Sequence, residues 1–216
     1  MRHLPHEVRI FAVGLAFMAG YVDAVGFLAA GGYFVSFMSG NSTRLAVGLA
    51  SSAPHVIAMS GVPICSFLAG VVVSTLVARK AGRFRAPAVL GLVAAGLAAA
   101  ATAGGLGFGL AAIGLAAAAM GAENALLERD GEVAVGLTYM TGALVKLGQG
   151  LAAHLAGASR FAWAPYLALW AGLVAGATGG ALAFPRLGIG ALWAAALTVG
   201  AASLYVLRWP PHYASR

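Results

Sequence analysis

Long apolar runs, separated by short polar stretches, follow one another along most of this chain. The runs lie at about residues 9–30, 56–78, 87–103, 106–127, 162–183 and 188–207. Each is close to the roughly 20 apolar residues that a helix needs to cross the hydrocarbon core of a bilayer. The pattern therefore predicts an all-α membrane protein with about six transmembrane helices.

Two further segments, 31–52 and 133–155, differ from these continuous runs. Each has an apolar start, a polar break, a basic residue and then a short apolar stretch. Non-helical backbone at membrane depth persists only where it is buried in protein or lines a water-filled cavity. We therefore expect both segments to be re-entrant or broken half-helices that mark an internal site.

The two broken segments resemble each other in sequence. When Phe37–Ala50 is aligned with Tyr139–Ala152, a Met, two Gly, two Leu and an Ala are identical. A basic residue also occupies the same aligned position, Arg44 in one segment and Lys146 in the other. Each segment follows a helix with an acidic residue and is followed by two more apolar runs, so the chain is predicted to be an internal repeat.

The basic residues predict how the chain is oriented in the membrane. The loop Arg79–Arg85 holds four positive charges, and the N-terminal end carries Arg2 and Arg9. Short basic segments stay on the cytoplasmic side, so an even number of crossings should separate the two. The first two long apolar runs supply that number, and segment 31–52 should enter and leave by the outer face.

The same reasoning extends to the second half. If segment 133–155 is also re-entrant, both termini are cytoplasmic, in a bacterial inner (cell) membrane. The chain is then a single membrane domain, 1–216, with repeat one at about 9–103 and repeat two at about 106–207. The two repeats have opposite orientations, a common plan for transporters. In the rival layout both broken segments cross fully, which gives about eight crossings and parallel repeats.

Composition supports lipid as the main solvent of the chain. It is 61% hydrophobic and only 9% charged, whereas a soluble domain has about 25% charged residues. The net charge of +7 is explained by cytoplasmic loops, so we expect no nucleic-acid partner. The single cysteine, Cys65, excludes an internal disulfide and a cysteine zinc site, and we expect it to face lipid or fill packing.

The polar breaks suggest where a ligand would bind. A half-helix beginning near Ser39 or Asn41, both good N-cap residues, would point its free N–H groups and positive end toward mid-membrane. In the second repeat, a half-helix beginning near Thr141–Gly142 would present its N-terminal end in the same way. The candidate substrate-binding residues are Asp23, Ser39, Gly40, Asn41, Ser42, Arg44, Glu123, Asn124, Thr141, Gly142 and Lys146.

The intramembrane acids need partners. Asp23 lies near the middle of the first helix, where a charge costs at least about 2.5–3.5 kcal/mol on insertion scales. Arg44 is its expected partner. Glu123 is nearer a helix end, where its position is less demanding, and Lys146 is its expected partner. These pairs could serve a proton-coupled solute site or act only as structural salt bridges.

Several motifs resemble a known family. They are Gly20–Leu28 and Phe37–Ser42, followed by Met120–Ala125 and Tyr139–Gly142. Together they resemble the YoaK-type family of bacterial inner-membrane proteins, which was defined as a domain of unknown function. In that family Thr is usual at the position of Ser39, and Gln at that of Glu123. The resemblance implies a multi-spanning bacterial membrane protein and supplies no substrate.

We therefore expect a small secondary transporter or permease for a small polar or anionic solute. The alternatives are a passive channel built on the same plan and a non-transporting membrane scaffold or partner subunit. We recognise no enzyme motif, metal site or cofactor site, and expect His55 and His154 to be interfacial. The ridge Gly172, Gly176 and Gly180 marks close helix packing, either internal or at a dimer seam. Together with the small size of the chain, it leads us to expect a homodimer.

Overall fold

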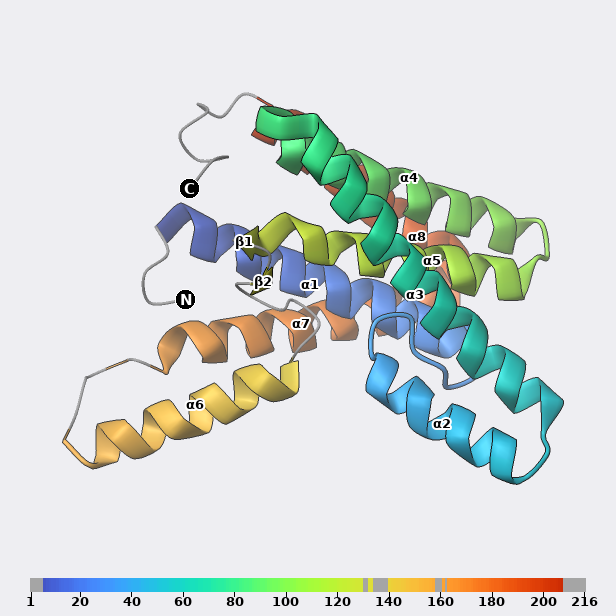
Figure 1. The fold of residues 1–216 in the computed structure, drawn as a ribbon, viewed down its shortest axis with the longest axis horizontal. Coiled ribbons are helices and arrows are strands. Elements are labelled where there is room, and N and C mark those ends of the chain that lie inside the picture. Colours follow the sequence, from blue (N-terminus) through green and yellow to red (C-terminus); the bar gives the residue numbers. More distant parts are fainter. Residues whose placement is uncertain (1–5, 130–131, 134–139, 158–160, 162, 208–216) are drawn as a thin grey trace.

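The computed structural model describes residues 6–129, 132–133, 140–157, 161 and 163–207. Its helices lie along one long axis (Figure 1). They are α1 (His6–Ala29), α2 (Met38–Ala50), α3 (Pro54–Ala81), α4 (Arg85–Gly105), α5 (Gly109–Glu123), α6 (Met140–Leu155), α7 (Ala164–Leu187) and α8 (Leu192–Val206). The shorter elements are the 3₁₀ turns η1 (Gly82–Phe84), η2 (Asn124–Leu127) and η3 (Gly188–Ala191), and the antiparallel strands β1 (Glu128–Arg129) and β2 (Glu132–Val133). The predicted all-α fold is confirmed.

Four helical stretches in the described part of the chain are long and apolar enough to cross a membrane. They are Val8–Ala29, Pro54–Gly105, Gly109–Leu126 and Ala164–Val206. The second contains α3 and α4, and the fourth contains α7 and α8, each pair joined by a 3₁₀ turn. The helices α1, α3, α4, α5, α7 and α8 thus correspond to the six apolar runs of the sequence.

Helices α5 and α8, of 15 residues each, reach spanning length because the 3₁₀ turns η2 and η3 extend them. The helices α2 and α6 have no such extension among the described residues and are too short to span. With 13 and 16 residues and a rise of 1.5 Å per residue they reach about 20 and 24 Å, short of the roughly 30 Å hydrocarbon core. Helix α2 runs from near the middle of the long axis to the end where α1 finishes, and α6 runs from the middle to the opposite end (Figure 1). This geometry favours the re-entrant arrangement over full crossing.

The glycine ridge of α7 packs inside the protein. A Cβ added at Gly172 would lie 3.0 Å from a methyl group of Val13 on α1, and one at Gly180 would overlap the carbonyl oxygen of Tyr21. Small residues let helix backbones approach this closely in a membrane. The ridge is therefore an internal seam between α1 and α7, and the expected homodimer stays a prediction based on size.

The seam between α1 and α7 has two reciprocal glycine contacts. A Cβ at Gly20 of α1 would overlap the carbonyl oxygen of Leu173, and a Cβ at Gly176 of α7 would overlap the carbonyl oxygen of Phe17. Neither helix could accept a larger residue here unless the two backbones moved apart.

The seam between α3 and α5 is built in the same way. A Cβ at Gly121 of α5 would overlap the carbonyl oxygen of Phe67, and a Cβ at Gly70 of α3 would overlap that of Ala118. The sequence separation between Gly20 and Gly121 equals that between Phe17 and Ala118. The contacting residues of α3 are likewise separated from those of α7 by one common number of residues. In Figure 1, α1 runs away from the N-terminal end of the molecule and α5 runs back toward it. These contacts support an inverted repeat.

Large apolar side chains cover much of the outer surface. Leu68, Leu182, Leu197 and Leu204 are all exposed, and so is Cys65. A water-soluble bundle would bury such residues, whereas lipid is as apolar as leucine and favours no such burial. The exposed leucines agree with a membrane location, and exposed Cys65 agrees with the lipid-facing position expected for it.

Candidate functional site

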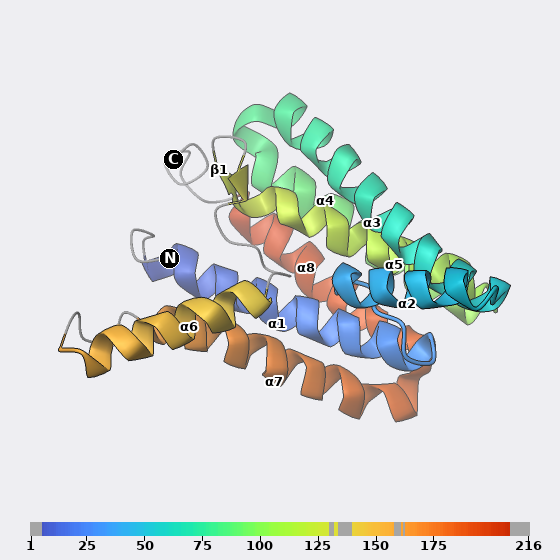
Figure 2. The ribbon, with the colours of Figure 1, turned by 60° about the horizontal axis from the view of Figure 1, so that its bottom comes forward.

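A non-helical loop connects α1 to the first half-helix. The chain turns back at Gly31 and Gly32, whose φ angles are +64° and +103°, a region that glycine enters without steric cost. Residues 33–37 then lead to α2, which begins at Met38. Figure 2 shows this loop folded back beside the C-terminal end of α1. Its backbone groups need partners, because lipid offers none.

Asp23 of α1 supplies two of these partners. Its Oδ1 atom accepts hydrogen bonds from the backbone N–H groups of Val35 (2.9 Å) and Ser36 (2.8 Å). The predicted pair between Asp23 and Arg44 is therefore wrong. The guanidinium of Arg44 instead lies 4.9 Å from the ring centroid of Tyr33. A carboxylate in this position holds the loop against α1, a role that pattern reasoning missed.

Asn41 supplies a second clamp. Its Oδ1 accepts from the N–H of Phe34 (3.1 Å), and its Nδ2 donates to the carbonyl of the same residue (2.6 Å). Asn41 is fully buried, and the ring of Phe34 packs against those of Phe27 and Phe37. The side chain of Asn41 thus pairs with both backbone groups of one loop residue, as a neighbouring strand would.

The start of α2 differs from the expected capping pattern. The N-cap residue is Phe37, and no side chain caps the helix, so the capping roles predicted for Ser39 and Asn41 are wrong. Ser42 instead donates to the carbonyl of Met38, within its own helix. The side chain of Asn41 bonds to the loop instead of the helix start. The N–H groups in the first turn of α2 therefore have no side-chain acceptor among the described residues.

This uncapped turn leaves donors available. The N–H groups of Ser39 and Gly40 have no acceptor among the described residues, and the side chains of Ser39 and Ser42 are exposed. A Cβ at Gly40 would lie 2.7 Å from the Phe37 ring, so glycine lets that ring fold over the helix start. The arrangement can donate hydrogen bonds to a polar or anionic group.

The second half-helix presents a similar start. Thr141 and Gly142 lie in the first turn of α6 and are exposed. Lys146 is also exposed, and its Nζ lies 5.7 Å from the ring centroid of Tyr166. No ion pair joins Lys146 to Glu123 within the described residues, so that predicted pair is wrong. Residues 134–139, which include part of the predicted polar segment, lie outside the described residues.

The two half-helices point their N-terminal ends toward each other. Figures 1 and 2 both show the start of α2 and the start of α6 near the middle of the long axis, with the two helices running to opposite ends. The candidate residues of α2 and α6 do not hydrogen-bond to one another in the described part of the chain. The structure therefore brings the two helix starts to a shared depth without a direct bond between them.

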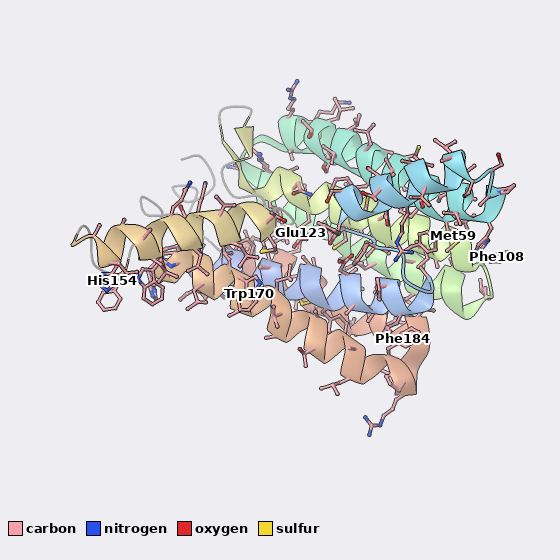
Figure 3. The ribbon with its side chains drawn as sticks, turned by 90° about the horizontal axis from the view of Figure 1, so that it is seen from below. Met59, Phe108, Glu123, His154, Trp170 and Phe184 are labelled. Carbon is pink, nitrogen blue, oxygen red and sulfur yellow. The ribbon has the colours of Figure 1, made fainter. Side chains whose placement is uncertain are left out.

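Glu123 is the last residue of α5 and is only 2% exposed. Its Oε2 atom is buried without a hydrogen-bond partner in the part of the chain that the structure describes. Figure 3 places Glu123 along the bundle between Phe108 and His154, which lie toward opposite ends. Glu123 does lie at a helix end, as predicted, but the expectation that this position is undemanding is wrong, because the helix end is buried inside the protein.

The seam contacts also correct the match between the repeats. If the sequence separation between Gly20 and Gly121 relates the two repeats, the residue that corresponds to Asp23 is Asn124 and not Glu123. Asn124 is buried, and its Nδ2 donates to the carbonyl of Met120 (3.0 Å) in its own helix. The signal was present in the sequence, because both motifs have a Gly followed three residues later by Asp or Asn and then Ala.

His55 and His154, which follow the two half-helices, have different surroundings. His55 is exposed, and His154 is half-buried with its ring 6.1 Å from that of Phe161. No group of three His, Cys, Asp or Glu residues is close enough to hold a metal ion among the described residues.

Comparison with known proteins places the chain in a family. A family model described as "Protein of unknown function (DUF1275)" matches residues 11–205. The chain belongs to this family. The chain is also similar to the UPF0700 transmembrane protein RA0705 of Rhizobium meliloti (strain 1021). The two sequences are 38% identical over 207 residues, which cover 92% of this chain and 88% of that protein. No solved structure matches.

The DUF1275 match confirms the resemblance to YoaK-type proteins that the motifs indicated. The named transmembrane relative and the apolar helices together establish a membrane protein.

Proposed function

We propose that this DUF1275 protein is a secondary transporter for a small anionic or polar solute, bound between the N-terminal ends of α2 and α6. The observation that carries the proposal is the first turn of α2, where Ser39 and Gly40 offer backbone N–H groups that have no acceptor in the described part of the chain. Such donors at a helix N-terminus attract anions and hydrogen-bond acceptors. Irregular backbone at this depth also belongs beside protein or a watery cavity.

The charges around the site favour an anion. Arg44 and Lys146 contact aromatic rings, and neither forms an ion pair with an acid among the described residues. Asp23 is bonded to loop N–H groups and so does not neutralise Arg44 directly. Each half-helix thus carries one cation in addition to the positive N-terminal end of its dipole, a combination that attracts a small anion more than a cation.

An inverted repeat would suit a carrier. Two halves of opposite orientation can rock about a central site and expose it to each side in turn. The orientation with both termini in the cytoplasm of a bacterial cell stays a prediction from the basic residues.

Flux through proteoliposomes tests this function. The purified protein would be reconstituted and screened for uptake of chloride, inorganic phosphate, sulfate, acetate and lactate, against protein-free vesicles. Arg44→Gln should lower uptake of the accepted anion by roughly tenfold or more, the loss of about 1.4 kcal/mol of binding. Arg186→Gln is the matched control, since Arg186 is an exposed arginine near the C-terminal end of α7.

The outcomes separate the candidate functions. Saturable uptake that Arg44→Gln reduces and Arg186→Gln leaves intact supports a carrier. Uptake that rises linearly with concentration supports the channel alternative. Uptake of every anion at the level of protein-free vesicles, by protein that remains folded and monodisperse, rejects transport of these anions and favours a scaffold.

A further inference from the structure

Glu123 is a buried acid that the solute site does not require. Its side chain is 2% exposed, and Oε2 has no hydrogen-bond partner in the described residues. We propose that Glu123 binds the proton that couples solute movement to a proton gradient. This inference rests on the proposed transport function and adds its coupling ion.

The surroundings of Glu123 favour a neutral carboxylic acid. Transfer of an isolated carboxylate into an apolar interior is costly enough that such a group is expected to neutralise instead. Glu123 also lies about one turn before the end of the helical run formed by α5 and η2, and the last turns of a helix carry partial negative charge that disfavours a carboxylate. Both effects favour binding of a proton while the site is closed.

Among the described residues, the elements packed against α5 provide no cation that pairs with the Glu123 carboxylate. These are α1, α3, α4 and η2. Their titratable and charged side chains in the described part of the chain are His6, Arg9, Tyr21 and Asp23 on α1, His55, Cys65, Arg79 and Lys80 on α3, and Arg85 on α4.

None of these groups forms an ion pair or a hydrogen bond with Glu123 among the described residues. Tyr21 donates to the carbonyl of Ala191 (3.1 Å), and Arg85 donates to the carbonyl of Ala125 (2.7 Å). Asp23 accepts from the loop. Because no cation among the described residues is paired with Glu123, the cost of burying its carboxylate is best relieved by binding a proton.

Proton binding would then select between conformations. Addition of H⁺ to the carboxylate gives a neutral acid that is compatible with the packed end of α5. Loss of the proton leaves a carboxylate that requires water, which favours a state in which this end is hydrated. A ligand shifts such an equilibrium only by its different affinity for the two states, and here the difference arises from the burial of Glu123.

Infrared spectroscopy of reconstituted protein tests proton binding without any solute. The wild type should show a protonated-carboxyl band that disappears as the pH is raised, and Glu123→Gln should lack that band. Glutamine matches the shape of the neutral acid and carries no titrating proton. A wild-type carboxyl band that does not respond to pH, or one that persists unchanged in Glu123→Gln, overturns the proposal.

A second measurement needs no variant. An apolar carbodiimide should modify Glu123 of wild-type protein at low pH and spare it at high pH, as read by mass spectrometry of the peptide. This measurement applies even if Glu123→Gln does not fold. Modification that is absent at every pH, or equal at all of them, contradicts a proton site at this residue.

Flux then tests coupling. For one proton carried with one monoanion, each pH unit across the membrane supports about a tenfold accumulation ratio, since one pH unit equals a tenfold change in proton activity. Glu123→Gln should still exchange solute but should not accumulate it. Gradient-driven accumulation retained by Glu123→Gln overturns the inference. A titrating Glu123 without any anion flux would instead reject the transport function and leave the proton site standing.

Discussion

Asp23 should hold the loop before α2 in place, and its replacement should release that loop. Asp23→Ala removes the acceptor of the N–H groups of Val35 and Ser36, at 2.9 and 2.8 Å. Hydrogen bonds to charged groups contribute about 1.5–3 kcal/mol each. Loss of both should therefore lower the free energy of loop opening by at least about 3 kcal/mol, or roughly 100-fold in the opening equilibrium.

Asp23→Asn should give an intermediate result. Its amide oxygen can still accept, but neutral hydrogen bonds contribute only about 0.5–1.5 kcal/mol each. We expect roughly a tenfold effect on loop opening, or about 1.4 kcal/mol. The order alanine, asparagine, aspartate tests whether the charge of the acceptor matters as well as its position.

Hydrogen–deuterium exchange of protein in nanodiscs measures this opening. Peptides that contain Val35 and Ser36 should exchange faster in Asp23→Ala than in wild type, whereas peptides from α7 should not. Thr178→Ala is the control, because the Thr178 hydroxyl donates only to the carbonyl of Val174 in its own helix (2.9 Å). If the two loop amides exchange at the wild-type rate in Asp23→Ala, the loop is held by something other than this carboxylate.

Two further predictions concern packing. Gly176→Ala should destabilise the protein by about 1–3 kcal/mol or prevent folding, because its Cβ would overlap the carbonyl oxygen of Phe17. Gly179→Ala on the same helix should change the free energy of unfolding by no more than about 0.5 kcal/mol, since the atom nearest to the added Cβ, on the Tyr21 ring, is 3.7 Å away. Equal thermal unfolding of the two variants would contradict this packing. Cys65→Ala should leave thermal unfolding unchanged, because the thiol is exposed, and a marked loss would show that Cys65 packs against protein.

Much of the architecture follows from the amino-acid sequence alone. The apolar run at about 56–78 became α3 (Pro54–Ala81), and the broken segment 31–52 contains α2 (Met38–Ala50). These features are local, because about 20 successive apolar residues suffice to specify a spanning helix and a polar break is enough to interrupt one. The sequence likewise indicated the family and the small-residue helix seams.

Partner choice was decided by the tertiary structure. Asp23 bonds to loop backbone instead of Arg44 because the turn at Gly31 and Gly32 carries residues 33–37 back along α1. Glu123 is buried because α5 ends inside the protein and not at its surface. A sequence specifies which groups need partners in a membrane, but which partner each obtains depends on the path of the chain through space.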